Sequence, residues 1–571
     1  MYQSRDRTLR DIRAAVLCVM CVLASAPMHS QTHLAHQASR RLGTVHFPNS
    51  GAPAAQEPFL RGIALLHSYE YVDAREAFSA ARLRDPEFAL AAWCEALTHS
   101  QFDWGTEDLV AARAVLLNFA PTRAARLAMA GTPEEREFGA AIESFLDDGA
   151  LLDRARGVAA AMRLWATHDP TNVEALAFAA RGALYVLRYA PADERRTRAE
   201  EAIALAEQVV AVAPDHPGGW HYLIHATDSP QFAARGLAAA RKYDSIAPDA
   251  DHALHMPSHI FLQLGMWDDV VRSNERAWAA SRAWAEAGRH SLAELGWHSL
   301  QWLQYGLLQQ GRFAAAGALI DTARTLLSGT TLSGYPDLRY TVETLTFQYA
   351  METGDWAAFP ANPSDHVALL SNAESATSRR EQAMVATAAY HVAAARMMQG
   401  ADTAAAHVVA ERFRAIAAPL PTGQPRREFL NQMATTLTAL LLSARGDVGG
   451  AVAAIKGRGS EREPGVAPIG PPNALIDAEL LGCWLLESKR TQDARVAYAL
   501  ALRERPNRWR ARLGLASALR LSGDARGADS MIDSVRKDWT RSGADAAALA
   551  RVTTEALLHD ARPPLPAGRC H

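Results

Sequence analysis

The stretch from Phe59 to Pro86, FLRGIALLHSYEYVDAREAFSAARLRDP, decides the fold. Apolar and small residues recur in it at helical spacing on both sides of a break near Tyr69, which predicts two amphipathic helices joined by a tight turn. With Ala55 counted as place 1, small, aromatic and proline residues fall at places 8, 17, 20, 24, 27 and 32: these are Gly62, Tyr71, Ala74, Phe78, Ala81 and Pro86.

The same register returns further along the chain at a period of 34 residues. Two contiguous units occupy 217–250 and 251–284, and single units begin at Trp297, Leu475 and Trp509. These residues resemble the tetratricopeptide repeat (TPR), a helix-turn-helix unit of 34 residues. The resemblance implies an all-α fold, an α-solenoid in which each hairpin buries its apolar face against its neighbours.

Composition supports helices and argues against nucleic acid as a partner. The chain has 571 residues, too many for one compact core, and combines 49% hydrophobic with only 7% aromatic residues. Alanine, the best helix former, is frequent throughout. Because 59 basic and 62 acidic residues leave a formal charge of −3, we expect no basic field for nucleic acid.

The N-terminus predicts export. Residues 1–30 fit a signal peptide, because a charged leader precedes the thirteen-residue apolar run AAVLCVMCVLASA, which is too short to span a bilayer comfortably. An uncleaved N-terminal anchor is the alternative. We therefore expect a periplasmic or secreted protein with no transmembrane span in the mature chain. Five widely spaced cysteines, two of them in the leader, indicate no disulfide framework.

The remaining chain divides by composition. We expect an extended N-terminal arm at 31–54, a TPR-like solenoid at 55–456, a Gly/Pro linker at 457–473, a C-terminal TPR pair at 474–545 and a C-terminal tail at 546–571. The linker is the best internal boundary.

Histidines concentrate between Trp220 and His259. Five of the 20 histidines lie there, in the runs WHYLIHATDSP and DHALHMPSHIF. At 3.6 residues per turn, the members of each run fall within about 60° of one another on a helix, so each run forms one polar stripe. The first stripe is His221, His225 and Asp228, and the second is His252, His255 and His259.

The TPR resemblance implies where these stripes face. In that family, places 2, 5, 9 and 12 of each first helix line the inner, concave surface, and both stripes occupy such places. This predicts a His-rich groove at 217–305. The next unit, which follows an insertion of twelve residues, has His298, Gln301 and Tyr305 at groove places, and His67 at place 13 is a weaker candidate. The run HALHMPSHIF resembles a group of exported bacterial TPR proteins with a His-rich central pair of repeats.

Imidazoles at i and i+4, joined by others from the next helix and a carboxylate, are typical of a transition-metal site. We therefore predict that zinc, copper or iron binds His221, His225, Asp228, His252, His255 and His259. The run HYLIH lacks the glutamate of the HExxH motif, so metalloprotease chemistry is not implied. Pro257 should kink the helix that carries three of these ligands.

Two functional hypotheses follow, and both stay open. The first is a binding scaffold whose groove holds a protein or peptide partner, either through a metal or through the histidines alone. The second is a metal-dependent enzyme of hydrolase or oxidase type, in which Asp228 or His252 acts as a ligand or a proton carrier. No P-loop, GxSxG or EF-hand motif occurs in the sequence to support another chemistry.

Overall fold

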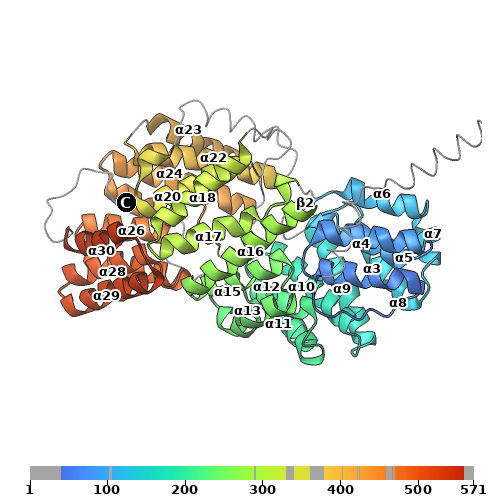
Figure 1. Ribbon diagram of the computed structural model, residues 1–571. Helices are drawn as coiled ribbons and strands as arrows, with labels where there is room; N and C mark the ends of the chain where they lie inside the picture. The colour runs from blue at the N-terminus through green and yellow to red at the C-terminus, as the bar shows by residue number, and fades with distance from the viewer. Residues whose placement is uncertain are drawn as a thin grey trace, which may run out of the picture.

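The computed structural model describes residues 40–101, 106–288, 291–328, 338, 340–359, 379–400, 403–420, 422, 425–457, 466, 468 and 470–558. Within these residues the regular structure is helical apart from one antiparallel pair of two-residue strands, β1 (Ser100–Gln101) and β2 (Thr106–Glu107). The predicted all-α solenoid is confirmed, because successive helices pair as antiparallel hairpins that pack on their neighbours (Figure 1). The predicted signal peptide lies outside the described residues.

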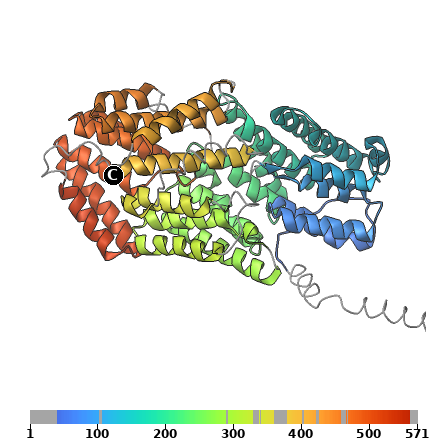
Figure 2. The same ribbon diagram turned by 90° about the horizontal axis from the view of Figure 1, so that it is seen from above.

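The helices follow one another along an elongated molecule. In Figures 1 and 2 the N-terminal helices, in blue, and the C-terminal helices, in red, lie at opposite ends, with the central hairpins between them. The N-terminal half contains α3 (Pro53–His67), α4 (Tyr71–Arg84), α5 (Ala89–Leu97), α6 (Leu109–Phe119), α7 (Arg123–Ala128), α8 (Pro133–Phe145), α9 (Leu151–His168), α10 (Val173–Tyr189) and α11 (Arg195–Val212).

Three hairpins form the centre of the molecule. They contain α12 (Pro217–Thr227), α13 (Ala233–Ile246), α14 (Asp251–His255), α15 (Pro257–Gln263), α16 (Trp267–Gly288), α17 (Trp297–Gln309) and α18 (Phe313–Leu327), with a 3₁₀ turn η2 at Leu292–Glu294.

The C-terminal half is likewise helical. It contains α20 (Thr341–Thr353), η4 (Trp356–Ala358), α22 (Arg379–Met398), α23 (Thr403–Ala417), α24 (Pro425–Ala444), α25 (Val448–Gly457), α26 (Asp477–Glu487), α27 (Thr491–Glu504), α28 (Trp509–Leu521), α29 (Ala525–Ser542) and α30 (Ala546–Leu558). Part of the expected C-terminal tail is thus a further helix, α30, which packs on α29.

The repeat positions read from the sequence are packing positions. A Cβ added to Gly62, at place 8, would lie 2.6 Å from the ring of Phe78, at place 24 of the same hairpin. The same relation recurs near the C-terminus, where a Cβ on Gly482 would lie 2.7 Å from the ring of Tyr498. A small residue is therefore required wherever the second helix of a hairpin presses an aromatic ring onto the first.

The N-terminal arm, described from residue 40, is non-helical up to Ala52, and α3 begins at Pro53. It runs back along the repeats, where the amide of Thr44 donates to the carbonyl of Asp215 at 2.9 Å. Phe47 anchors it, 4% exposed and 5.7 Å from the rings of both Phe59 and Trp165. The arm therefore belongs to the core of the N-terminal half.

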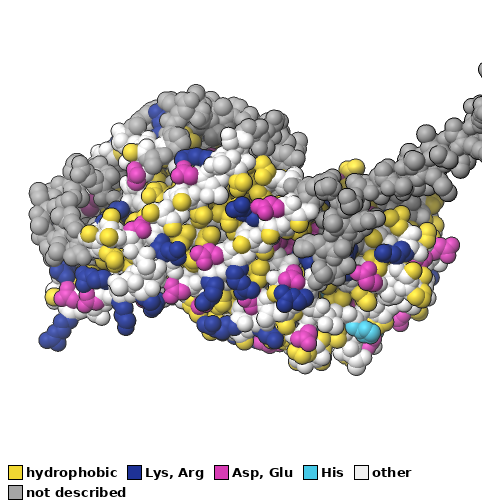
Figure 3. Space-filling view, in the orientation of Figure 1, with side chains coloured by type: hydrophobic (Ala, Val, Ile, Leu, Met, Phe, Trp, Pro, Cys, Tyr) yellow, Lys and Arg dark blue, Asp and Glu magenta, His cyan; other side chains and the backbone are white. Residues whose placement is uncertain are grey.

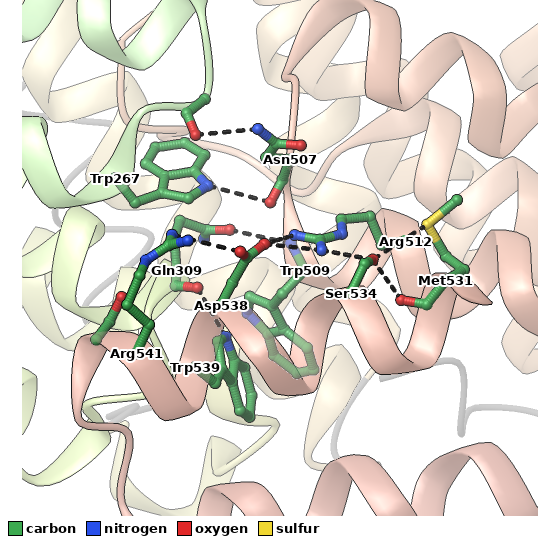
Figure 4. Close-up of polar contacts among 12 residues, drawn as sticks. Trp267, Gln309, Asn507, Trp509, Arg512, Met531, Ser534, Asp538, Trp539 and Arg541 are labelled. Carbon is green, nitrogen blue, oxygen red and sulfur yellow. Dashed lines mark hydrogen bonds and ion pairs between the residues drawn. The ribbon is translucent and has the colours of Figure 1, made fainter. Parts of the chain in front are cut away.

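The C-terminal TPR pair packs against the central repeats. Trp267 Nε1 donates to the carbonyl of Asn507 at 3.1 Å, and Trp539 Nε1 donates to the carbonyl of Gln309 at 2.9 Å (Figure 4). Turns of the central hairpins thus contact the C-terminal hairpins, and the linker before them does not separate two independent bodies. A neighbouring buried cation, Arg508, pairs with carboxylates from both parts, as described below.

Among the described residues, no helix has the length and apolar character that crossing a membrane requires.

Candidate functional site

Six histidines from three successive first helices meet in the centre of the molecule. His221 and His225 lie on α12, His252 and His255 on α14, His259 on α15, and His298 on α17. Met256, just before Pro257, separates α14 from α15, and its own dihedrals stay helical (φ −54°, ψ −36°). Pro257 has no backbone N–H, so one helical hydrogen bond is absent at this point.

The first group, which we call triad A, contains His221, His225 and His252. One nitrogen from each ring lies within 4.8 Å of the others. The Nε2 atoms of His221 and His225 are 3.1 Å apart, and the rings of His221 and His252 have centres 5.1 Å apart. Nitrogens bound tetrahedrally to one zinc ion at 2.0–2.1 Å lie roughly 3.3 Å apart, so this spacing suits a shared metal ion.

The second group, triad B, contains His255, His259 and His298, again with one nitrogen from each within 4.8 Å of the others. The Nε2 atoms of His255 and His259 lie 3.0 Å apart, and the rings of His255 and His298 have centres 4.7 Å apart. His298, placed by the sequence on the groove but not among the metal ligands, therefore joins the cluster. The structure divides the predicted ligands into two groups rather than one.

Hydrogen bonds fix the tautomer of one ring in triad A. His221 Nδ1 lies 2.6 Å from the carbonyl oxygen of His67. Since a carbonyl can only accept, Nδ1 carries the proton and Nε2 keeps its lone pair. Through this backbone contact His67 orients a ring of the cluster, although its own side chain does not reach triad A.

Two rings of triad B are fixed in the same way. His259 Nδ1 donates to Asp228 Oδ2 at 2.7 Å, and His255 Nδ1 donates to Asn274 Oδ1 at 2.6 Å. The amide of Asn274 is itself oriented, because its Nδ2 donates to the carbonyl of Val270 at 2.8 Å. With both Nδ1 atoms protonated, two Nε2 lone pairs face each other across 3.0 Å. A cation must lie between them, either a metal ion or a second proton on one ring.

Asp228 therefore orients a histidine. Its side chain is 3% exposed, and its other oxygen, Oδ1, accepts from Gln263 Nε2 at 2.8 Å. A buried carboxylate on the far nitrogen of a histidine is the arrangement that commonly supports a metal-binding imidazole. The sequence predicted Asp228 as a ligand or proton carrier, and the structure places it behind His259.

Burial favours the neutral form of four of the six rings. His221 is fully buried and its pKa falls from 6.5 to about 3, chiefly because burial disfavours the charged ring. Burial first, and then the neighbouring histidines, lower the pKa of His225, His252 and His255 well below 6.5. Neutral imidazole is the form that binds metal, so these rings are in the ligand form at neutral pH.

A buried cation reinforces this neutrality. Arg181 is 1% exposed, and its guanidinium lies 5.7 Å from the ring centre of Tyr69 and 5.4 Å from that of Tyr185. Its charge contributes to the lowered pKa values of His67 and His221. Positive charge beside an imidazole favours the neutral ring.

An aromatic ring packs against the histidines of each triad. The ring of Tyr69 lies 4.3 Å from His221 and 5.7 Å from His252. The ring of Trp302 lies 4.3 Å from His259 and 5.2 Å from His255. These rings enclose the cluster and lower the local dielectric around it.

Tyr69 occupies a strained backbone position. Its φ of 59° is in the left-handed region, and it stands at place 15, where Gly265 (φ 66°) and Gly311 (φ 69°) stand in the central hairpins. A non-glycine residue there costs about 1–3 kcal/mol and often marks a functional site. Lys489, at place 15 of the unit from Leu475, also has a positive φ (60°) and is exposed, so a non-glycine residue at this place does not by itself indicate a site residue in the sequence.

An acidic pair lies beside triad A. Glu70 Oε1 accepts from the backbone amide of His252 at 3.4 Å, and the carboxyl of Asp251 is close enough to form a side-chain hydrogen bond with Glu70. Burial, followed by the charge of Asp251, raises the pKa of Glu70 well above its ordinary value. The pair therefore favours a protonated carboxyl beside the histidines more than an isolated glutamate does.

A third buried group, His67, Glu174 and His216, is a closed network. Glu174 Oε2 accepts from His67 Nε2 at 2.8 Å and Oε1 accepts from His216 Nε2 at 3.1 Å. The remaining ring nitrogens are also occupied, His67 Nδ1 by the hydroxyl of Tyr222 at 2.7 Å and His216 Nδ1 by the amide of Gly219 at 3.3 Å. Every ring nitrogen of this group is thus engaged in a hydrogen bond, and the group supports the structure around His221.

Three predicted groove residues have other roles. His67 is fully buried in that network and cannot line an open groove. Tyr305 is also fully buried, and its hydroxyl accepts from Arg508 at 3.2 Å, so the expectation that it faces a ligand is wrong. Gln301 is partly buried and donates to Asn473 Oδ1 at 2.9 Å. The repeat register placed these residues on the correct helices but did not predict the direction of each side chain. The C-terminal half packs over the end of α17.

On the face drawn in Figure 3, acidic and basic side chains are interspersed over the described residues.

Comparisons with known proteins give only distant structural similarities. No protein-family model matches the chain, and no curated protein matches it in sequence. Among solved structures, a human IFIT1 dimer with m7Gppp-AAAA is similar with 11% identity and a TM-score of 0.35, over 91% of this chain and 95% of that one. The TPR domain of P58(IPK) is similar with 11% identity and a TM-score of 0.18, over 83% of this chain and 99% of that one. At these values neither comparison bears on function.

Proposed function

We propose that this protein is a TPR-like scaffold that binds a transition metal through the histidines of triads A and B and presents it to a ligand. The observation that carries the proposal is the pair of Nε2 atoms in triad B, 3.0 Å apart, whose rings are held by Asn274 and Asp228 so that both lone pairs face inward. A metal ion satisfies both lone pairs at once.

The surrounding chemistry supports a metal over a shared proton. Within each triad a third imidazole stands within 4.8 Å of the facing pair, giving a set of three nitrogen donors. Burial keeps four of the six rings neutral, and protonating any of them has a free-energy cost. Zinc, copper and iron are the metals that accept such imidazole donors.

The burial of the cluster limits what can reach the metal. His221 and His255 are at most 2% exposed, while the other four rings are partly buried. A small molecule, or one side chain of a bound protein or peptide partner, fits this accessibility better than an extended peptide lying across the histidines. The leader sequence supports export, which would give the protein a periplasmic or secreted location.

A second candidate function is metal-dependent catalysis of hydrolase or oxidase type. The observation in its favour is Glu70, a buried carboxyl with a raised pKa whose oxygen contacts the backbone of His252. A carboxyl with a raised pKa beside a metal site is suited to general acid–base work. The metal, when bound, would supply an activated oxygen ligand.

The experiment is metal analysis of the purified mature protein after growth with zinc, copper and iron. The His225→Ala/His255→Ala variant removes one ligand from each triad and should lose the metal. His168→Ala is the matched control, because that ring is 56% exposed and distant from the cluster in the chain, and it should keep the metal. Chelator should lower the melting temperature of the wild type only, since a metal bound by the folded state stabilises it. Absence of metal from the wild type would overturn the proposal.

A further inference from the structure

We infer that the site is dinuclear, with one metal ion in triad A and one in triad B, and that copper is the metal the donor set favours. The inference rests on the proposed metal site and specifies its stoichiometry and its ligand groups. It differs from the prediction made from sequence, in which one ion took ligands from both stripes.

The grouping of the rings carries the inference. Each triad brings three ligand nitrogens within 4.8 Å of one another, and the two triads share no histidine. The Nε2 pairs at 3.1 Å and 3.0 Å are pairs within a triad, His221 with His225 and His255 with His259. Three protein ligands with a further position left open is the usual composition of a reactive metal site.

The two triads adjoin each other. The ring centres of His225 and His259 lie 6.1 Å apart, and those of His252 and His255 lie 6.0 Å apart. Rings in different triads are therefore no farther apart than some rings within triad A, where the centres of His225 and His252 are 6.4 Å apart. Two ions would therefore share one enclosure, where a small oxygen ligand can bridge them, as in other two-metal sites.

The donor set selects among metals. All six groups are imidazoles, and the nearest carboxylate, Asp228, is engaged with His259 Nδ1 and Gln263. Magnesium, calcium and manganese prefer oxygen donors, and non-haem iron sites include a carboxylate. Nitrogen-only sites suit copper and zinc, and copper is the divalent ion of highest affinity in this series.

The test is copper loading of the chelated full-length mature protein, followed by dialysis against a weak competing chelator and measurement of copper per chain. The wild type should retain two copper ions. His252→Ala removes a ligand from triad A alone, His298→Ala removes one from triad B alone, and each should retain one. His168→Ala, the exposed control used above, changes neither triad nor their supporting contacts, so it should retain two. Circular dichroism melts establish that each variant is folded.

Electron paramagnetic resonance (EPR) adds a readout of proximity. A lone Cu(II) ion gives a full signal, whereas two Cu(II) ions in one enclosure couple and lose signal intensity. The wild type should give much less than two spins, and each single variant should give about one spin from its one ion.

The outcomes separate this inference from the proposed function. One copper ion in the wild type, lost in both single variants, would overturn the dinuclear site and leave the metal site standing. Two ions with full signal intensity, or loss of one ion in His168→Ala, would place the second ion outside the two triads and also overturn it. No copper and no zinc in the wild type would overturn the proposed function as well.

Discussion

The carboxylate of Asp228 accepts a hydrogen bond of 2.7 Å from His259 Nδ1 across the boundary between two repeats. Asp228 ends helix α12 and His259 lies on α15, so the bond ties the ring orientation in triad B to the packing of the preceding hairpin. This relationship gives the first prediction.

Asp228→Asn should weaken metal binding without changing the number of ions bound at saturation. The amide keeps the shape but removes the charge that raises the basicity of His259, and such changes cost about 10–100-fold in metal affinity. Competition with a chromophoric chelator measures the loss. Asp321→Asn, at a side chain 76% exposed, is the control and should bind as the wild type does. Loss of one ion at saturation would instead make Asp228 a ligand.

Tyr69→Gly and Lys489→Gly should have opposite effects on stability. Both residues have φ near 60°, so glycine relieves similar backbone strain at each. Lys489 is exposed, and the change should stabilise the protein by about 1 kcal/mol. Tyr69 is 4% exposed and packs against the histidines. Loss of its ring should cost about 3 kcal/mol or more, which exceeds the gain from relieving the backbone strain. Urea unfolding of the metal-free protein measures both, and a stabilised Tyr69→Gly would show that this ring contributes little packing.

The metal-free protein should lose stability as the pH falls below 6.5. In the unfolded chain His221 and His255 take up protons near 6.5, whereas burial keeps their pKa lower in the folded chain, about 3 for His221. The unfolded state then binds more protons, so the free energy of unfolding falls by up to about 1.4 kcal/mol per pH unit for each ring.

Urea unfolding at pH 7.5 and 5.5 in the presence of chelator measures this dependence. His221→Gln/His255→Gln should have a shallower dependence than the wild type. Equal free energies of unfolding for the wild type at both pH values would mean that these rings are not buried in the neutral form.

Arg508→Ala should destabilise the fold strongly. The Arg508 guanidinium is fully buried, pairs with Glu352 and donates to Glu479 Oε1 at 2.6 Å. Removing it leaves buried carboxylates without their cation, which costs about 3–5 kcal/mol. Arg541→Ala breaks an exposed pair with Asp268 and should cost under about 1 kcal/mol after solvent screening. Similar small losses for both variants would show that the C-terminal half is not docked as described.

The helical hairpins and the location of the histidine cluster could be predicted from the repeat register. Gly62 and Phe78 predict a hairpin, because its two helices can pack closely only where a small residue on one faces an aromatic ring on the other. This rule is local, so it can be recognised in the sequence. The same register placed His221, His225, His255 and His259 on adjacent first helices. Their concentration in one place was therefore predictable.

The grouping of the histidines was not predictable, for physical reasons. The division between the triads falls between His252 and His255, which lie on the same helix, so it depends on how the neighbouring hairpins pack. His298 follows an insertion of twelve residues, whose path decides whether the ring reaches triad B. Tyr305 was misplaced because Arg508, more than 200 residues later, packs against it. Contacts between residues so far apart in the chain produce no local periodicity in the sequence.

The most direct test of the metal site is anomalous X-ray diffraction from crystals of the copper-loaded protein, recorded above and below the copper absorption edge. The account predicts two anomalous peaks, one among the Nε2 atoms of His221, His225 and the ring of His252, and one among His255, His259 and His298. The account would be contradicted if the crystals contained copper elsewhere on the protein but showed no anomalous peak among these histidines.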